Sequence, residues 1–181
     1  MVNSSDNFAS PQSKNFLQNS VGMGQIAVAS NAGTLRTLVG SCVSVALGDP
    51  KLNLAGLAHV LLPESHGTTE EPGRFADTAI TELLRQLNKL SRDKQPHWKA
   101  KIAGGAAMFP GHEEVTVGTQ NIAAVETLLR KNRIPIVAKV CGGEQGRRVS
   151  IDVARTLEVA REIAQTKPEH KRAKGSRSSS F

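Results

Sequence analysis

The sequence has 181 residues, of which 39% are hydrophobic, and this is the size of one domain with an apolar core of its own. The net charge is +7, but four of those charges fall in residues 167–181 and only 3% of the residues are aromatic, so we expect no stacking platform for nucleic acid. No apolar run approaches the roughly 18 residues of a membrane span, and the N-terminus lacks the apolar segment of a secretory signal, so we expect a cytoplasmic protein without a transmembrane segment.

The composition divides the chain into three parts. Residues 1–20 are rich in Ser, Asn and Gln and are expected to form a flexible leader, whereas residues 21–165 carry the hydrophobic patterning of a folded domain. Residues 166–181 are rich in Lys, Arg and Ser, which is typical of a disordered tail. If the tail instead contacted a nucleic acid or a membrane surface, removing residues 167–181 would abolish a steeply salt-dependent binding.

The first half of the domain is predicted to consist of strands. Residues 25–29 form a short one, and Gly-Ser-Cys at 40–42 precedes an alternating strand at 43–47. Asp49-Pro50 and Asn53 mark a turn. The nearly continuous apolar run 54–62 is long enough only for a buried strand.

In the second half the hydrophobic period changes from that of a strand to that of a helix. Residues 74–92 are predicted to form an amphipathic helix, followed by a strand at 98–103 that Gly104-Gly105 ends. Asn121 is the expected N-cap of a second helix. The inward side chains of that helix are expected to be Ile122, Val125, Leu128 and Leu129. Strands follow at 134–140 and 148–153, whereas 156–165 fits either a strand or a helix. This order predicts an α+β domain with mixed sheets and outer helices.

Cys42 is a candidate nucleophile, because a glycine two positions earlier permits a tight corner whose N–H groups can face a reacting centre. The other cysteine, Cys141, has no partner pattern. Without a Cys-x-x-Cys pair, and with the histidines scattered, a structural zinc site is not expected. The residues alone leave a second interpretation of Cys42, as a small buried side chain at the start of a strand.

His59 shares one face of the predicted strand 54–62 with Ala55, Leu57 and Leu61. A buried imidazole needs a hydrogen-bond partner, and it is either a satisfied core histidine or a catalytic one. If its strand lies beside that of Cys42, the pair would lower the thiol pKa and supply a proton to a leaving amine. Hydroxyls at Thr37 and Ser41 flank the thiol and can orient an imidazole, or can simply serve the local turns.

Two glycine pairs, Gly104-Gly105 and Gly142-Gly143, each follow a predicted strand. Neither continues as a dinucleotide-binding motif, so the pairs indicate places where the backbone approaches another element closely.

Six segments across residues 21–155 together point to a known family. They are TLVGSCVSVAL at 37–47, GLAHVLLP at 56–63, GRFADTAI at 73–80, KIAGGAAMF at 101–109, VGTQN at 117–121 and GGEQGRRV at 142–149. The most specific are Gly-Ser-Cys with a histidine seventeen positions later and the block around Gly104-Gly105. In these segments and in their order, the sequence resembles the CheD family, the chemoreceptor glutamine deamidases of bacterial chemotaxis.

The resemblance implies a fold like that of glutamine-deamidating bacterial toxins, with a sandwich-like core of mixed sheets and helices packed outside. It implies hydrolysis of receptor glutamine side chains to glutamate by a thiol mechanism that needs no cofactor and no metal. By position the implied nucleophile is Cys42 and the implied imidazole is His59. Gly40 and Ser41 would support the oxyanion through the backbone, and Gly104-Gly105 would adjoin the substrate.

Two positions depart from the family pattern. Some relatives place the third catalytic residue, a threonine, six positions before the cysteine, where this chain has Arg36, so Thr37 is the implied counterpart. Leu157 stands where a glycine normally closes the last hairpin.

The implied partners are the cytoplasmic helices of chemoreceptors and a CheC-type phosphatase. An alternative function is that of a non-enzymatic adaptor that docks on receptors or on such a phosphatase.

Overall fold

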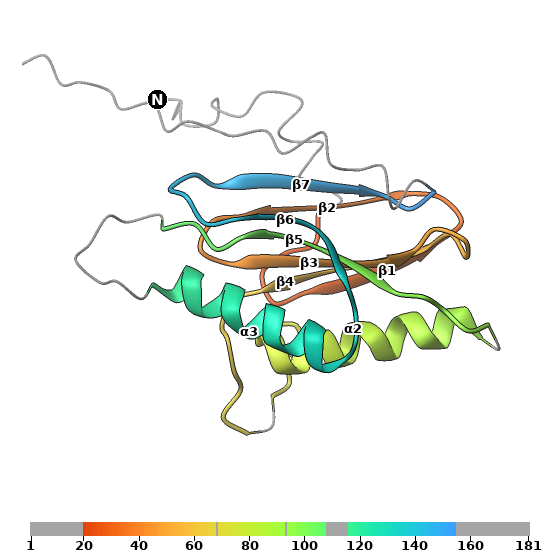
Figure 1. Cartoon of the computed structure of the whole chain (residues 1–181), viewed down its shortest axis with the longest axis horizontal. Helices are drawn as coiled ribbons and strands as arrows, with labels where there is room; N and C mark the ends of the chain where they lie inside the picture. The colour runs from red at the N-terminus through yellow and green to blue at the C-terminus, as the bar shows by residue number, and fades with distance from the viewer. Residues whose placement is uncertain (1–19, 68, 93, 108–115, 155–181) are drawn as a thin grey trace, which may run out of the picture.

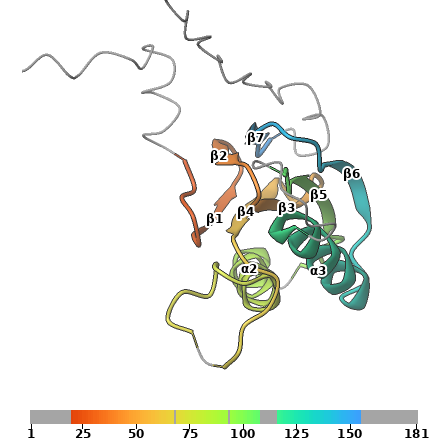
Figure 2. The same cartoon turned by 90° about the vertical axis from the view of Figure 1, so that its left-hand side faces the viewer.

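In a computed structural model, residues 20–67, 69–92, 94–107 and 116–154 are described. The expected tail and the segment 156–165, with Leu157, lie outside these ranges, and of the expected leader only Ser20 lies inside them. The described residues form an α+β domain of three layers. A five-stranded sheet lies in the middle, a two-stranded sheet covers one of its faces, and two helices cover the other (Figures 1 and 2).

The five-stranded sheet is mixed, as the sequence predicts. Its strands are β1 Ile26–Ser30, β3 Val43–Asp49, β4 Leu54–Val60, β5 Lys99–Gly104 and β6 Ile136–Cys141. Their order in space is β1-β4-β3-β5-β6, and every pair is antiparallel except β5 and β6. β3 and β4, at the centre, are buried along their whole length, which explains their almost unbroken apolar sequence.

The two-stranded sheet pairs β2, Thr34–Val39, with β7, Arg147–Asp152. The hydrophobic pattern predicts β7 but not β2. On β2 the polar Thr37 points inward and is fully buried, whereas Leu38 is 47% exposed. This reversal of the usual alternation hides the strand from an analysis of hydrophobic periodicity.

The helices are α2, Ala76–Ser91, and α3, Val117–Lys131. The prediction that Asn121 caps the second helix is wrong, because α3 begins four residues earlier, where the Thr116 hydroxyl accepts a hydrogen bond from the N–H of Thr119. Asn121 is instead fully buried inside the helix. Among the described residues, no helix combines the length and the apolar character needed to cross a membrane.

The central sheet has a hydrophobic core on each face. Leu83 and Leu87 of α2 and Val125 and Leu129 of α3 pack on one face against β3, β4 and β5. On the other face, β2 and β7 cover the sheet, and a smaller hydrophobic cluster lies between the two sheets. That cluster contains Val21, Val39, Ala46, Ala55, Leu57, Ala103, Val149, Ile151 and Val153. Two of the three predicted catalytic side chains, Cys42 and His59, lie on this second face.

Candidate active site

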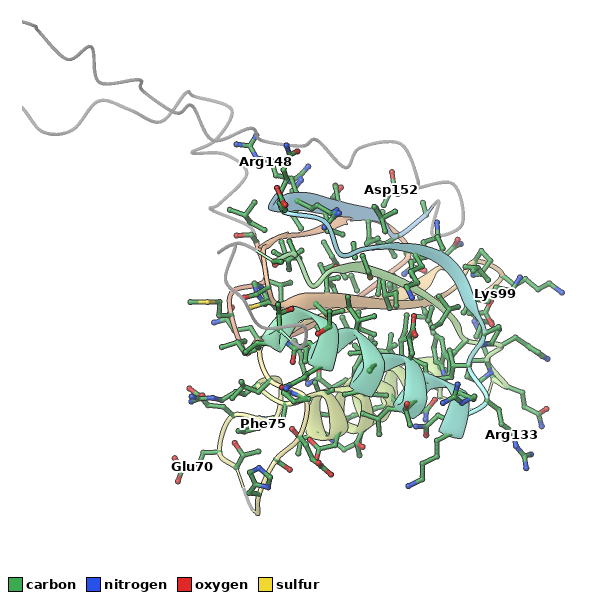
Figure 3. All side chains as sticks on the ribbon, turned by 60° about the vertical axis from the view of Figure 1, so that its left-hand side comes forward. Glu70, Phe75, Lys99, Arg133, Arg148 and Asp152 are labelled. Atoms are coloured by element: carbon green, nitrogen blue, oxygen red, sulfur yellow. The ribbon has the colours of Figure 1, made fainter. Side chains whose placement is uncertain are left out.

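Cys42 lies at the corner where the chain leaves the two-stranded sheet and enters the five-stranded one. It follows β2 by three residues and directly precedes β3. Its side chain is half-buried and packs against the cluster between the two sheets. β5 starts at Lys99 and reaches this corner at its last residue, Gly104. The site therefore lies at the end of the sheet near Arg148 of β7, whereas Lys99 and Arg133 lie at the other end (Figure 3).

The carbonyl groups of the three residues at this corner all accept hydrogen bonds. The donors come from the segment after β5 and from α3. They are Ala106 N to Gly40 O at 2.8 Å, Asn121 Nδ2 to Ser41 O at 3.2 Å, and Gly105 N to Cys42 O at 2.8 Å. With its carbonyls held in this way, the corner presents a fixed backbone beside the thiol. The structure thus brings Gly40, Ser41, Gly104 and Gly105 together beside Cys42.

Gly104 has a φ of +117° and lies so close to this corner that a Cβ on it would be 2.1 Å from Cys42 O. Gly104→Ala is therefore expected to lower the free energy of unfolding by about 3–5 kcal/mol, because it combines a strained backbone with a clash against backbone. Urea unfolding measures the loss.

Gly33→Ala is the matched control, since Gly33 has a φ of +126° and no atom within 4 Å of an added Cβ. This control isolates the backbone strain, which costs about 1–3 kcal/mol. Equal losses in the two variants would show that the contact with Cys42 has no part in the effect.

The segment around Gly104 is supported in turn by the second glycine pair. Gly142 N donates to Gly104 O at 2.9 Å, and Ala107 N donates to Gly143 O at 2.7 Å. The guanidinium of Arg147, which is almost fully buried, donates through Nη2 to Gly142 O at 2.7 Å. Both glycine pairs thus lie where two segments approach closely, as the sequence predicts.

His59 is on β4 and is only 4% exposed. Its N–H donates to Gln25 O and its carbonyl accepts from Gly24 N, both at 3.0 Å, so its pairing with Ser44 on β3 is the kind without backbone hydrogen bonds. Side chains lie closest at such pairs. Cys42 is two residues from Ser44 and packs on the same face, so the register of β3 and β4 places it diagonally across from His59.

The third predicted residue, Thr37, contacts the same imidazole from the other sheet. Thr37 Oγ1 is 2.8 Å from His59 Nδ1 and 2.7 Å from Val21 O. The carbonyl can only accept, so the single hydroxyl proton goes to Val21 and the threonine oxygen accepts from His59 Nδ1–H. This network assigns the proton to Nδ1 and leaves Nε2 with a free lone pair. Among the residues that the structure describes, Nε2 has no hydrogen-bond partner.

The electrostatics of the pair differ from the prediction. Burial raises the pKa of the Cys42 thiol above its ordinary value, although the backbone N–H of Cys42 opposes the shift. Burial lowers the pKa of His59, and a hydrogen bond with the Val21 backbone opposes that shift. The resting pair is therefore a neutral thiol and a neutral imidazole rather than an ion pair. This arrangement suits His59 to act as a general base for Cys42.

Asn121 is a site residue that sequence reasoning missed. Its Nδ2 donates to Ser41 O at 3.2 Å and to Leu61 O at 2.8 Å. One feature of the sequence could have revealed it. Asn121 is a polar residue on the inward face of the helix, between Gly118 and Val125. Its place in the motif was instead interpreted as a cap.

Comparisons with known proteins identify relatives of this chain. A family model described as "CheD chemotactic sensory transduction" matches residues 61–161, a range that contains Gly104 and Asn121 but begins two residues after His59. The chain is 40% identical over 134 residues to the chemoreceptor glutamine deamidase CheD of Thermotoga maritima, covering 74% of this chain and 84% of that protein.

Two archaeal proteins named probable chemoreceptor glutamine deamidase CheD show similar agreement. That of Methanococcus maripaludis strain C6 is 39% identical over 149 residues, which are 81% of this chain and 96% of the relative. That of Archaeoglobus fulgidus is 41% identical over 132 residues, 71% of this chain and 83% of the relative.

Proposed function

Since the chain belongs to the CheD family, we propose that it hydrolyses side-chain amides of chemoreceptor glutamines to glutamate, with Cys42 as the nucleophile. The observation that carries the residue assignment is the contact between Thr37 Oγ1 and His59 Nδ1. It leaves Nε2 of His59 unprotonated on the face that Cys42 shares. We also infer that the fold is that of the deamidase-toxin-like cysteine hydrolases and that the reaction takes place in the cytoplasm.

The first half of the reaction forms a thioester and releases ammonia. Nε2 of His59 removes the thiol proton while the sulfur of Cys42 attacks the carboxamide carbon of the glutamine. The negative charge that develops on the amide oxygen is held by backbone N–H groups at Ser41 and Cys42. When the tetrahedral intermediate collapses, the C–N bond breaks and His59 returns its proton to the leaving nitrogen, which departs as ammonia.

The second half hydrolyses the thioester. His59, neutral again, takes a proton from a water molecule that attacks the thioester carbon. The C–S bond then breaks, the sulfur recovers the proton from His59, and the product is a glutamate side chain. Each event adds one negative charge to a receptor helix, which changes the electrostatic repulsion between neighbouring helices.

The experiment that tests this function is the incubation of the protein with a purified chemoreceptor cytoplasmic fragment. Conversion of glutamine to glutamate raises the mass of the fragment by about one dalton per site and releases one ammonia. Peptide mapping then identifies the glutamines. Absence of any mass gain and of ammonia, with a fragment known to carry unmodified glutamines, would contradict the proposal.

Thr37→Val tests the role of the hydroxyl with little change of volume. The valine can no longer accept from His59 Nδ1–H or donate to Val21 O, so the imidazole loses its fixed orientation and tautomer. We expect kcat for receptor deamidation to fall about 10–100-fold. This is less than the loss of kcat in triads whose third residue is a charged carboxylate. Steady-state kinetics on the receptor fragment measures the effect.

Thr37→Ser keeps the hydroxyl and is expected to retain most of the wild-type kcat. If serine lowers kcat as much as valine does, the role assigned to the hydroxyl is wrong and the packing of the threonine methyl group decides the effect.

A further inference from the structure

Asn121 connects the two segments that carry the proposed nucleophile and base. It lies in the second turn of α3 and is fully buried. Its amide nitrogen donates to Ser41 O, the carbonyl directly before Cys42, and to Leu61 O, two residues after His59. One side-chain group therefore joins the start of β3 to the end of β4 at the edge of the site.

The orientation of the amide follows from its partners. Both neighbours are carbonyl oxygens, so the nitrogen must face them and Oδ1 must point away. Oδ1 is buried and has no partner among the described residues. A buried carbonyl without a partner is unfavourable, but the amide nitrogen offsets this cost by donating to two backbone carbonyls. What the residue contributes is therefore specific to Ser41 O and Leu61 O.

The start of α3 holds Asn121 in place. A Cβ on Gly118, one turn before Asn121, would lie 2.6 Å from Gly105 O, so helix and glycine segment are in direct backbone contact. Gly105 N in turn holds Cys42 O. The helix thus reaches the Cys42 corner by two routes, through this backbone contact and through the amide of Asn121.

We propose that Asn121 is a positioning residue, which fixes the Cys42 corner relative to the strand of His59 by donating one hydrogen bond to each. The proposal deepens the function proposed above and rests on it. Because the residue contacts neither the reacting atoms nor the substrate, its loss changes the geometry of proton transfer between thiol and imidazole. A misplacement of about 1 Å is enough to lower kcat about 100-fold.

The test compares Asn121→Ala and Asn121→Asp with Asn132→Ala. Alanine removes both hydrogen bonds of the amide nitrogen. Aspartate keeps the shape of the side chain but places a carboxylate oxygen where that nitrogen faces the two carbonyls. Asn132 makes the same kind of bond at the other end of α3, from Nδ2 to Leu128 O at 2.8 Å, far from the site. With the receptor fragment as substrate, we expect kcat to fall about 100-fold for both Asn121 variants and KM to stay within about threefold. Asn132→Ala is expected to keep the wild-type values.

Alkylation with iodoacetamide supplies a readout that needs no receptor. Cys42 and Cys141 are both half-buried, and peptide mapping separates their rates. A local displacement is expected to change the rate at Cys42 more than the rate at Cys141, which lies two strands away on β6.

A kcat within about threefold of wild type in both Asn121 variants would overturn the proposal. So would a rise in Cys141 alkylation that parallels the loss of activity, because Asn121 would then serve folding alone. An inactive wild type contradicts the proposed function itself, and the Cys42 alkylation rates still report on Asn121.

Discussion

Replacement of Cys42 by alanine is expected to lower deamidation of a chemoreceptor fragment at least about 10⁴-fold, to the background of the uncatalysed reaction. Without the sulfur no thioester forms, and the neutral His59 next to it has no nucleophile to activate. The mass of the receptor fragment after incubation should stay constant, and no ammonia should be released.

Cys141→Ala is the matched control, because Cys141 is the second half-buried thiol of the described residues and lies on β6. It is expected to keep full activity. Binding of Cys42→Ala to the receptor fragment is expected to remain, so a pull-down separates the enzyme from the adaptor. Wild-type rates of ammonia release from Cys42→Ala would exclude Cys42 as the nucleophile. Binding without any ammonia release by the wild type would instead favour the adaptor, docked on a receptor or on a CheC-type phosphatase.

His59→Gln is expected to lower kcat about 10³-fold, which is typical for the loss of a general acid–base group. The glutamine amide can fill much of the buried volume and can still donate to Thr37 Oγ1, but it cannot carry a proton from the thiol to the leaving nitrogen. The variant should bind the receptor fragment with a nearly unchanged KM. A kcat within tenfold of wild type would remove His59 from the mechanism.

The pH dependence of the wild type tests the neutral state of the pair. Burial holds the pKa of His59 below its ordinary 6.5, so the acidic limb of kcat/KM should have its midpoint below pH 6.5. Burial holds the pKa of Cys42 above 9.0, so its alkylation rate should still be rising at pH 9. A plateau of alkylation at neutral pH would instead indicate a thiolate–imidazolium ion pair.

The same shift has a consequence for stability. Folded His59 takes up a proton less readily than the unfolded chain does, so the free energy of unfolding should fall as the pH drops through 6.5. His59→Gln is expected to lose this part of the pH dependence, because it removes the titrating imidazole.

The central sheet and its helix α2 could be predicted from sequence because their hydrophobic periods are clear. β3 and β4 form nearly unbroken apolar runs, and α2 shows a helical stripe in which Leu83 and Leu87 are buried. Both kinds of element were therefore predicted within a few residues of their true ends. β2 could not be predicted, since its buried position is a threonine and an exposed one a leucine. The inward side chain of Thr37 forms a hydrogen bond with His59 instead of adding an apolar group to the core.

The candidate site, too, could be predicted from sequence only in part. The grouping of Cys42, His59 and Thr37 was expected on the resemblance to a family, and hydrophobic pattern alone left Cys42 and His59 open to a structural interpretation. The neutral protonation state depends on how deeply the fold buries two polar groups, which no local pattern contains. Asn121 was misread because asparagine is common at helix starts, and only the packing of α3 on the Cys42 corner reveals its two carbonyl partners.

The pairing of β2 with β7 bears on when the protein becomes active during its synthesis. Thr37 pairs in register with Val149, more than a hundred residues later in the chain. Although Arg36 of β2 already bridges to Ser20, β2 lacks its partner strand until β7, the last described strand, leaves the ribosome. Contacts this distant in sequence form late, because closing so large a loop is entropically unfavourable. A nascent chain that already displays Cys42 and His59 would therefore still lack an oriented imidazole. Receptor modification thus waits for a complete domain, and C-terminally truncated chains should leave receptors unmodified.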